Sequence, residues 1–169
     1  MNNILGTSKL KKIGLFAGTF DPFTLGHLDI VQQAKNDFNS VIIGVARNRP
    51  DKLRKYDREL MKYAIEKSIA DTDLQNVNCV VNNSSTGEEA LLLGCSSLIR
   101  GIRNKEDMIY EQKFADYNKH HFNLNTVFYM SPEHLKNVSS SKVKELLCSN
   151  QAIDNLVPRA IYELIKEGL

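Results

Sequence analysis

The sequence predicts a single-domain α/β protein with a doubly wound, parallel sheet of five strands. Short apolar runs alternate with longer segments of helical periodicity along most of the chain, which is typical of strand–helix–strand units. The run at 41–46 is almost continuously apolar, as expected for a parallel strand that is covered on both faces. Right-handed crossovers between such strands would place helices on both faces of the sheet.

The apolar runs and the periodic segments give an expected order of elements. The strands are expected at residues 13–17, 41–46, 77–81, 97–100 and 125–130. The helices are expected at residues 27–38, 57–70, 88–93, 105–120 and 139–147, and Pro158 suits the first turn of a last helix.

Local signals predict the starts and inner faces of two helices. Asp57 is a typical N-cap residue for the helix at 57–70. Thr86, with Glu89 three residues later, fits a capping box for the next helix. Leu60, Ala64 and Ile65 are expected to face inward from the helix that Asp57 caps.

The composition suits one domain over residues 12–169, preceded by a polar, unpatterned extension at residues 1–11. No apolar run approaches the roughly 20 residues of a membrane span, and the start of the chain lacks the apolar core of a signal peptide. We therefore expect a cytoplasmic protein with no membrane partner. Cys79, Cys95 and Cys148 are odd in number and lack CxxC spacing, which predicts buried free thiols rather than disulfides or a zinc site.

The charge is nearly balanced, with 22 basic and 20 acidic residues. Such a balance does not indicate a nucleic-acid-binding protein. The segment between Arg47 and Arg58, which we call the basic segment, departs from this balance because it holds six basic and two acidic residues. It follows an expected strand, so it should lie at the carboxyl edge of the sheet, where we expect it to close over small anionic substrates.

The stretch AGTFDPFTLGH, from Ala17 to His27, joins the first expected strand to the first expected helix. Gly18 and Gly26 allow close backbone approach, Pro22 restricts the turn, and the Thr19 hydroxyl lies at the end of the strand. Backbone N–H groups at a helix start and the positive end of its dipole favour an anion. The stretch lacks GxGxxG and P-loop signatures, yet it indicates a nucleotide site.

TFDPFTLGH resembles the TxGH form of the HxGH signature of the nucleotidylyltransferase superfamily. LIRGIR at residues 98–103, Tyr110 with Glu111, and VSSSK at residues 138–142 follow in an order that resembles the bacterial phosphopantetheine adenylyltransferase family. The resemblance runs from about Lys12 to near the C-terminus and implies a Rossmann-like fold. It implies direct in-line transfer of the adenylyl group of ATP to 4′-phosphopantetheine, giving dephospho-CoA and pyrophosphate in coenzyme A biosynthesis, without a covalent enzyme intermediate.

The resemblance also implies roles for individual residues. His27 would stabilise the transition state, with Thr19 and Arg103 beside it as catalytic residues. The residues implied to bind 4′-phosphopantetheine are Thr19, Lys52, Thr86, Arg100 and Asn118. The residues implied to bind ATP are Thr19, Phe20, His27, Gly101, Ile102, Arg103, Glu111, Leu135, Lys136, Asn137, Val138, Ser139, Ser140 and Ser141.

The resemblance further implies Mg²⁺ carried on the ATP phosphates, binding of coenzyme A, and a homohexamer; no carboxylate cluster in the sequence marks a dedicated metal site. Lys52 is assigned by aligning Tyr56 with an aromatic residue of the family, and Leu135 stands where the family often carries an aromatic residue. Two alternatives remain: another nucleotidylyltransferase of the superfamily, such as a nicotinate mononucleotide adenylyltransferase, or a non-catalytic nucleotide-sensing module.

Overall fold

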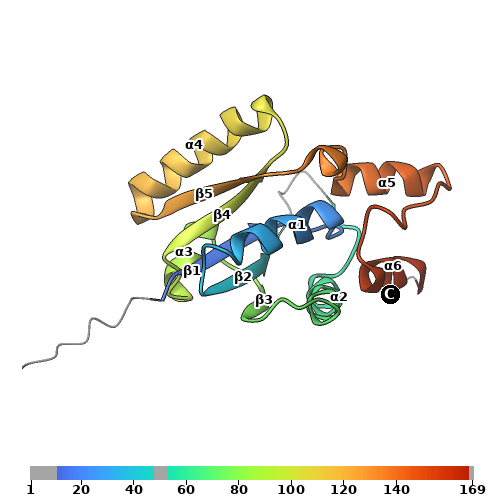
Figure 1. Cartoon of the computed structure of the whole chain (residues 1–169), viewed down its shortest axis with the longest axis horizontal. Helices are drawn as coiled ribbons and strands as arrows, with labels where there is room; N and C mark the ends of the chain where they lie inside the picture. Colours follow the sequence, from blue (N-terminus) through green and yellow to red (C-terminus); the bar gives the residue numbers. More distant parts are fainter. Residues whose placement is uncertain (1–10, 48–52, 168–169) are drawn as a thin grey trace, which may run out of the picture.

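The computed structural model describes residues 11–47 and 53–167, which form one α/β unit around a parallel sheet (Figure 1). The sheet has five strands in the order β3-β2-β1-β4-β5. These strands are β1 (Ile13–Gly18), β2 (Ser40–Val45), β3 (Val77–Val81), β4 (Ser97–Ile102) and β5 (Asn125–Met130). The central strand, β1, pairs on one side with β2 and on the other with β4, all in parallel. The predicted doubly wound, five-stranded sheet is confirmed.

The helices lie between and after the strands, as the periodicity predicts. Within the described residues they are α1 (Leu25–Ala34), α2 (Arg58–Ala70), α3 (Thr86–Leu92), α4 (Lys105–Phe122), α5 (Ser140–Cys148) and α6 (Arg159–Glu167), with a short 3-10 helix, η1 (Glu133–Leu135), before α5. None of the helices that the structure describes is long and apolar enough to cross a membrane.

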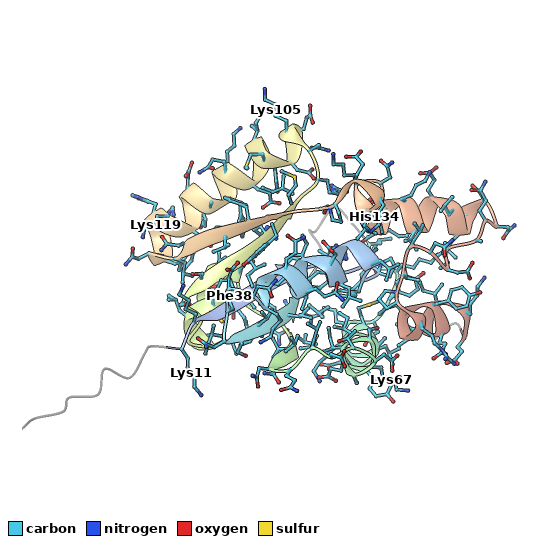
Figure 2. All side chains as sticks on the ribbon, viewed as in Figure 1. Lys11, Phe38, Lys67, Lys105, Lys119 and His134 are labelled. Atoms are coloured by element: carbon cyan, nitrogen blue, oxygen red, sulfur yellow. The ribbon has the colours of Figure 1, made fainter. Side chains whose placement is uncertain are left out.

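Two hydrophobic cores cover the two faces of the sheet, because successive residues of a strand point to opposite sides. Phe16 of β1 packs in the larger core, which α1, α2, α5 and α6 cover. Leu15, the preceding residue, packs in the smaller core with Leu98 and with residues of α3 and α4. Figure 2 shows Lys105 and Lys119 near opposite ends of α4, with their side chains directed away from the sheet.

Two helix starts differ from the sequence-based prediction. The helix α1 begins at Leu25 rather than at His27, because Thr24 is the N-cap and forms a capping box with His27. The helix α3 is capped by Ser85 with Glu88, one residue before the predicted pair. Before α3, three successive hydroxyl residues at 84–86 can each serve as an N-cap, so the local pattern does not decide between them. The predicted N-cap at Asp57 is confirmed.

Two predictions of burial are wrong. Leu60 is 36% exposed, and its neighbour Met61 is fully buried against the larger core. Ala64 and Ile65 are buried as predicted, so the inner face of α2 differs from the expected one only in that Met61 takes the place of Leu60. Cys148 is exposed at the last residue of α5, whereas Cys79 and Cys95 are buried as predicted.

Candidate active site at the carboxyl ends of the strands

A cavity of about 720 Å³ opens at the carboxyl ends of the strands. It is lined by the loop after β1, the first turn of α1, the end of β4, the first half of α4 and the start of α5. In a parallel α/β sheet this edge is where ligands bind, because the loops and helix N-termini converge there. The three sequence motifs, far apart in the chain, therefore meet around one cavity.

His27 lies in the first turn of α1 and lines this cavity. The backbone N–H of Thr24 donates to its Nδ1 at 3.0 Å, and the Thr24 Oγ1 lies 3.0 Å from the same nitrogen. An Nδ1 that accepts a hydrogen bond carries no proton, so the neutral ring bears its hydrogen on Nε2. The cap of the helix thus selects the tautomer that can donate from Nε2.

Three aromatic rings surround the imidazole of His27. The ring centroids of Phe20, Phe23 and Phe16 lie 5.0, 5.4 and 6.2 Å from that of the imidazole. Burial among these rings, together with the positive charges of Arg103 and Arg100, lowers the pKa of His27 to about 3. The imidazole is therefore neutral at pH 7, with its hydrogen on Nε2.

Asp21 fixes the loop between β1 and α1. Its carboxylate, 2% exposed, accepts hydrogen bonds from the backbone N–H groups of Lys55 and Tyr56 and an ion pair from Lys144 at 3.2 Å. Burial opposes ionisation, but the hydrogen bonds from Tyr56, Lys55 and Lys144 hold the pKa of Asp21 below its usual value. An ionised carboxylate that is bound in this way orders the loop.

Arg100, at the end of β4, forms a two-point ion pair with Glu111 of α4. Its Nε and Nη2 each donate to a Glu111 oxygen at 2.6 Å, and its Nη1 donates to the carbonyl of Ala17 at 2.8 Å. The guanidinium also stacks over the ring of Phe114. The protein itself thus holds all three nitrogens of Arg100, at the wall of the cavity.

Arg103 pairs with Asp107 one turn into α4. The Arg103 Nε donates to the Asp107 Oδ2 at 2.8 Å, and the Arg103 side chain is 41% exposed. Between the two arginines, Gly101 lines the cavity, whereas Ile102 is buried and faces the core. The LIRGIR segment therefore offers two paired arginines and a glycine to the cavity.

The serine run begins α5 beside the loop after β1. Ser139 is the N-cap and accepts from the backbone N–H of Lys142, while the Ser140 hydroxyl donates to the carbonyl of Pro22 at 2.7 Å. Both line the cavity together with Val138 and Ser141. The residues before them do not line it: Leu135 ends η1, Lys136 pairs with Glu133, and Asn137 follows.

The remaining predicted residues are spread out. Thr86, at the start of α3, lines the cavity, and so do Thr19 and Phe20. Asn118 is 2% exposed within α4, where its Nδ2 donates to the carbonyl of Phe114, and it does not line the cavity. Lys52 lies outside the described residues.

Four polar lining residues outside the loop after β1 were not assigned to the site from the sequence: Asp107, Tyr110, Ser131 and Lys144. Two of them carry a signal that could have found them. Lys144 lies four residues after Ser140, on the same face of α5, and Ser131 directly follows the last strand at its carboxyl end. Tyr110 belongs to the family pattern but was given no role there, and Asp107, also in the first half of α4, has no comparable signal.

Comparisons with known proteins show which family the chain resembles. The model of the family described as Cytidylyltransferase-like matches residues 15–146. A phosphopantetheine adenylyltransferase of Streptococcus pneumoniae is 40% identical over 159 residues, which cover 92% of this chain and 95% of that protein. A phosphopantetheine adenylyltransferase of Latilactobacillus sakei is 39% identical over 161 residues, which cover 94% of this chain and 96% of that protein.

Solved structures support the fold. A Vibrio parahaemolyticus protein assigned as a nicotinate-nucleotide adenylyltransferase has a TM-score of 0.66 at 16% identity, with 94% of each chain covered. A bifunctional NMN adenylyltransferase/ADP ribose pyrophosphatase from Francisella tularensis also has a TM-score of 0.66, at 13% identity, over 94% of this chain and 53% of that one.

The fold and the site thus define a nucleotidyltransferase of the Cytidylyltransferase-like class. With about 40% identity over nine-tenths of its length, the chain belongs to the phosphopantetheine adenylyltransferase family. The family assignment that the motifs predict is confirmed.

Proposed function

We propose that this protein transfers the adenylyl group of ATP to 4′-phosphopantetheine, giving dephospho-CoA and pyrophosphate, as a step of coenzyme A biosynthesis. The observation that carries the proposal is a neutral His27, held in its Nε2–H tautomer, in one cavity with Arg100, Arg103 and the serine run. Family membership at about 40% identity supports the choice of substrates.

The acceptor is already an anion, so the reaction needs alignment and charge stabilisation more than a strong base. A phosphate oxygen of 4′-phosphopantetheine attacks the α-phosphorus of ATP in line, and the bond from that phosphorus to the bridging oxygen of pyrophosphate breaks. The Nε2–H of His27 would donate to a non-bridging oxygen whose charge grows in the transition state. Arg103 and the hydroxyls of the serine run would bind the phosphates of ATP.

Arg100 is the proposed ligand for the phosphate of 4′-phosphopantetheine. In the structure Glu111 occupies the two donors that such a phosphate would use. On binding, the substrate phosphate would therefore replace the Glu111 carboxylate at the guanidinium of Arg100. The released Glu111 could then contact the nucleotide, which is the role that we propose for it. Thr19, Thr86 and Asn118 are the other proposed contacts of this substrate.

Lys52 completes the proposed substrate site. Its replacement by alanine is expected to raise the KM for 4′-phosphopantetheine more than that for ATP, because the charge would act on the acceptor phosphate. Filter binding of DNA at physiological salt is expected to show little affinity, since a few phosphate contacts are screened. Salt-sensitive DNA binding that depends on Lys52, with unchanged kinetics, would contradict this assignment.

Mg²⁺ is proposed to enter with ATP. Each carboxylate that lines the cavity is paired with a basic residue of the protein: Asp21 with Lys144, Asp107 with Arg103 and Glu111 with Arg100. In residues 11–47 and 53–167, no group of three or more acidic, histidine or cysteine side chains is arranged to hold a metal ion. Both observations fit an ion that the triphosphate coordinates and that neutralises charge on the leaving pyrophosphate.

A homohexamer that works in the cytoplasm and also binds coenzyme A is the assembly that the family resemblance favours. Exposed apolar side chains, among them Ile109 of α4 at 57% and Met130 of β5 at 55%, are available for contacts between subunits. Light scattering at micromolar concentration measures the assembly directly, and a monomer under these conditions would contradict the hexamer.

The test of the reaction is pyrophosphate release from Mg²⁺–ATP with 4′-phosphopantetheine or nicotinate mononucleotide offered separately. Release that depends on 4′-phosphopantetheine is expected. Release only with nicotinate mononucleotide would assign the protein to the alternative adenylyltransferase activity. No release with either acceptor, in a protein that binds ATP by calorimetry, would indicate a nucleotide-sensing module.

A further inference from the structure

Arg54, in the basic segment, points its guanidinium at the protein backbone. Its Nη1 donates to the carbonyl of Thr19 at 2.7 Å and to that of Ala46 at 3.3 Å. Its Nη2 donates to the carbonyl of Phe20 at 3.5 Å, and its Nε donates to the carbonyl of Tyr56. These carbonyls come from the ends of β1 and β2 and from the start of α2, so one side chain joins three segments of the site.

The loop after β1 also uses a side chain, that of Asp21, to bind the backbone next to Arg54. Asp21 accepts from the backbone N–H groups of Lys55 and Tyr56, at distances of 3.0 to 3.1 Å. Arg54 and Asp21 thus exchange side chain–backbone hydrogen bonds between residues 19–21 and residues 54–56. Hydrogen bonds to charged groups contribute more to stability than hydrogen bonds between neutral groups.

The backbone that these bonds hold is strained at Phe20. Its φ of 43° lies in the left-handed region, which a bulky residue adopts only when the surroundings impose it. Its ring fills the space above Gly18, where an added Cβ would come within 2.8 Å of it. The same ring lies 5.0 Å from that of His27, so relaxation at Phe20 would move a wall of the histidine pocket.

We propose that Arg54 is a positioning residue for adenylyl transfer: its fork of donors holds Thr19 and Phe20 in the strained geometry that shapes the cavity and packs His27. This inference rests on the proposed function; it concerns Arg54 and leaves Lys52 of the same segment as a proposed substrate contact. Arg58, in the same segment, likewise donates to the backbone, to the carbonyl of Asn82 at 2.9 Å.

The variants Arg54→Met and Arg54→Lys distinguish the effect of the guanidinium hydrogen bonds from the effect of the positive charge. Methionine keeps much of the aliphatic stem and removes every donor, whereas lysine keeps the charge but cannot reach three segments at once. Because a small misplacement of reacting groups costs up to about 10²-fold, both variants are expected to lower kcat by roughly 10- to 100-fold. Arg58→Met is the matched control, since it removes the same charge four residues away, and its kcat is expected to stay near the wild-type value.

Amide hydrogen exchange of the free protein provides a readout that does not depend on turnover. The Arg54 variants are expected to exchange faster at the amides of Lys55 and Tyr56 than the wild type and Arg58→Met do, while thermal denaturation still shows a folded protein. Should Arg54→Met fail to fold, Arg54→Lys carries the same comparison.

Two results would overturn the proposal. The first is wild-type kcat and exchange in Arg54→Lys, which would mean that the charge alone matters. The second is a rise confined to the KM for 4′-phosphopantetheine, which would make Arg54 a substrate ligand. If the wild-type protein shows no adenylyl transfer at all, the proposed function fails, whereas the exchange comparison still decides whether Arg54 holds the loop.

Discussion

The loop after β1 and the segment after β4 reach the same cavity from neighbouring parallel strands, yet they use their polar groups differently. In the loop after β1 and the first turn of α1, polar side chains are bound to nearby backbone: His27 to Thr24, and Asp21 to Lys55 and Tyr56. At the end of β4 and directly after it, Arg100 and Arg103 are each paired with a carboxylate of α4.

The difference indicates two ways of preparing a site for phosphates. The first loop presents a neutral donor whose orientation is set before any substrate binds, so little reorganisation is needed during reaction. In the second segment each arginine is paired with a carboxylate of the protein, and an incoming phosphate has to displace that carboxylate. Changes in the first loop should therefore act on kcat, and changes in the second should act on substrate affinity and on stability.

The largest effect is expected from His27→Ala. Loss of one donor to the developing charge should lower kcat by roughly 10²- to 10³-fold. The affinity for ATP should remain close to that of the wild type, because the contact strengthens only in the transition state. Steady-state kinetics and calorimetry measure the two quantities, with His120→Ala, an exposed histidine of α4, as the control. A collapse of ATP affinity with unchanged kcat would make His27 a ground-state ligand.

Arg100→Lys should act chiefly on 4′-phosphopantetheine. One ammonium cannot replace the two-point pair with Glu111 and the bond to Ala17, nor a two-point contact with phosphate. The kcat/KM for 4′-phosphopantetheine should fall by at least about tenfold, since one charge-assisted hydrogen bond contributes about 1.5 to 3 kcal/mol. The control is Arg159→Lys, because Arg159 forms an exposed pair with Glu163. If kcat/KM for 4′-phosphopantetheine fell equally in Arg100→Lys and Arg159→Lys, Arg100 would have no specific role in binding this substrate.

The neutral state of His27 predicts a pH dependence of stability. Its pKa is about 3 in the folded protein and near 6.5 in the unfolded chain, so the unfolded chain binds more protons between these values. The contribution of His27 is therefore complete above pH 6.5 and is lost progressively as the pH falls toward 3. The free energy of unfolding, measured with urea at several pH values across this range, should rise less steeply with pH for His27→Gln than for the wild type. Identical slopes would mean that the imidazole is charged in the folded state.

The smallest effect is expected from the cysteines. Burial raises the pKa of Cys79 to about 12 and that of Cys95 to about 11, so neither thiol is ionised at pH 7. Cys148 is exposed on α5 and does not line the cavity. Cys148→Ser should leave kcat unchanged, and replacement of all three should reduce stability without reducing turnover in the folded fraction. Lost turnover in a variant that folds and binds both substrates would contradict a mechanism without a thiolate.

Local patterns in the sequence determined most of the fold and the location of the site. The alternation of apolar runs with periodic segments predicted all five strands and that they are parallel, because strands buried on both faces of a sheet are typically apolar throughout. The order of the strands in the sheet came from the structure. The segments TFDPFTLGH, LIRGIR and VSSSK each follow a strand or begin a helix, so their convergence at one edge follows from the topology.

Only the tertiary structure decided how the polar side chains of the site are paired. Arg100 and Glu111 are 11 residues apart, Asp21 and Tyr56 are 35 apart, and Asp21 and Lys144 are 123 apart. Such pairs depend on how α2, α4 and α5 dock on the sheet, which no local pattern encodes. The tautomer of His27 likewise depends on where α1 begins, because Thr24 as the N-cap directs its backbone N–H to the Nδ1 of His27.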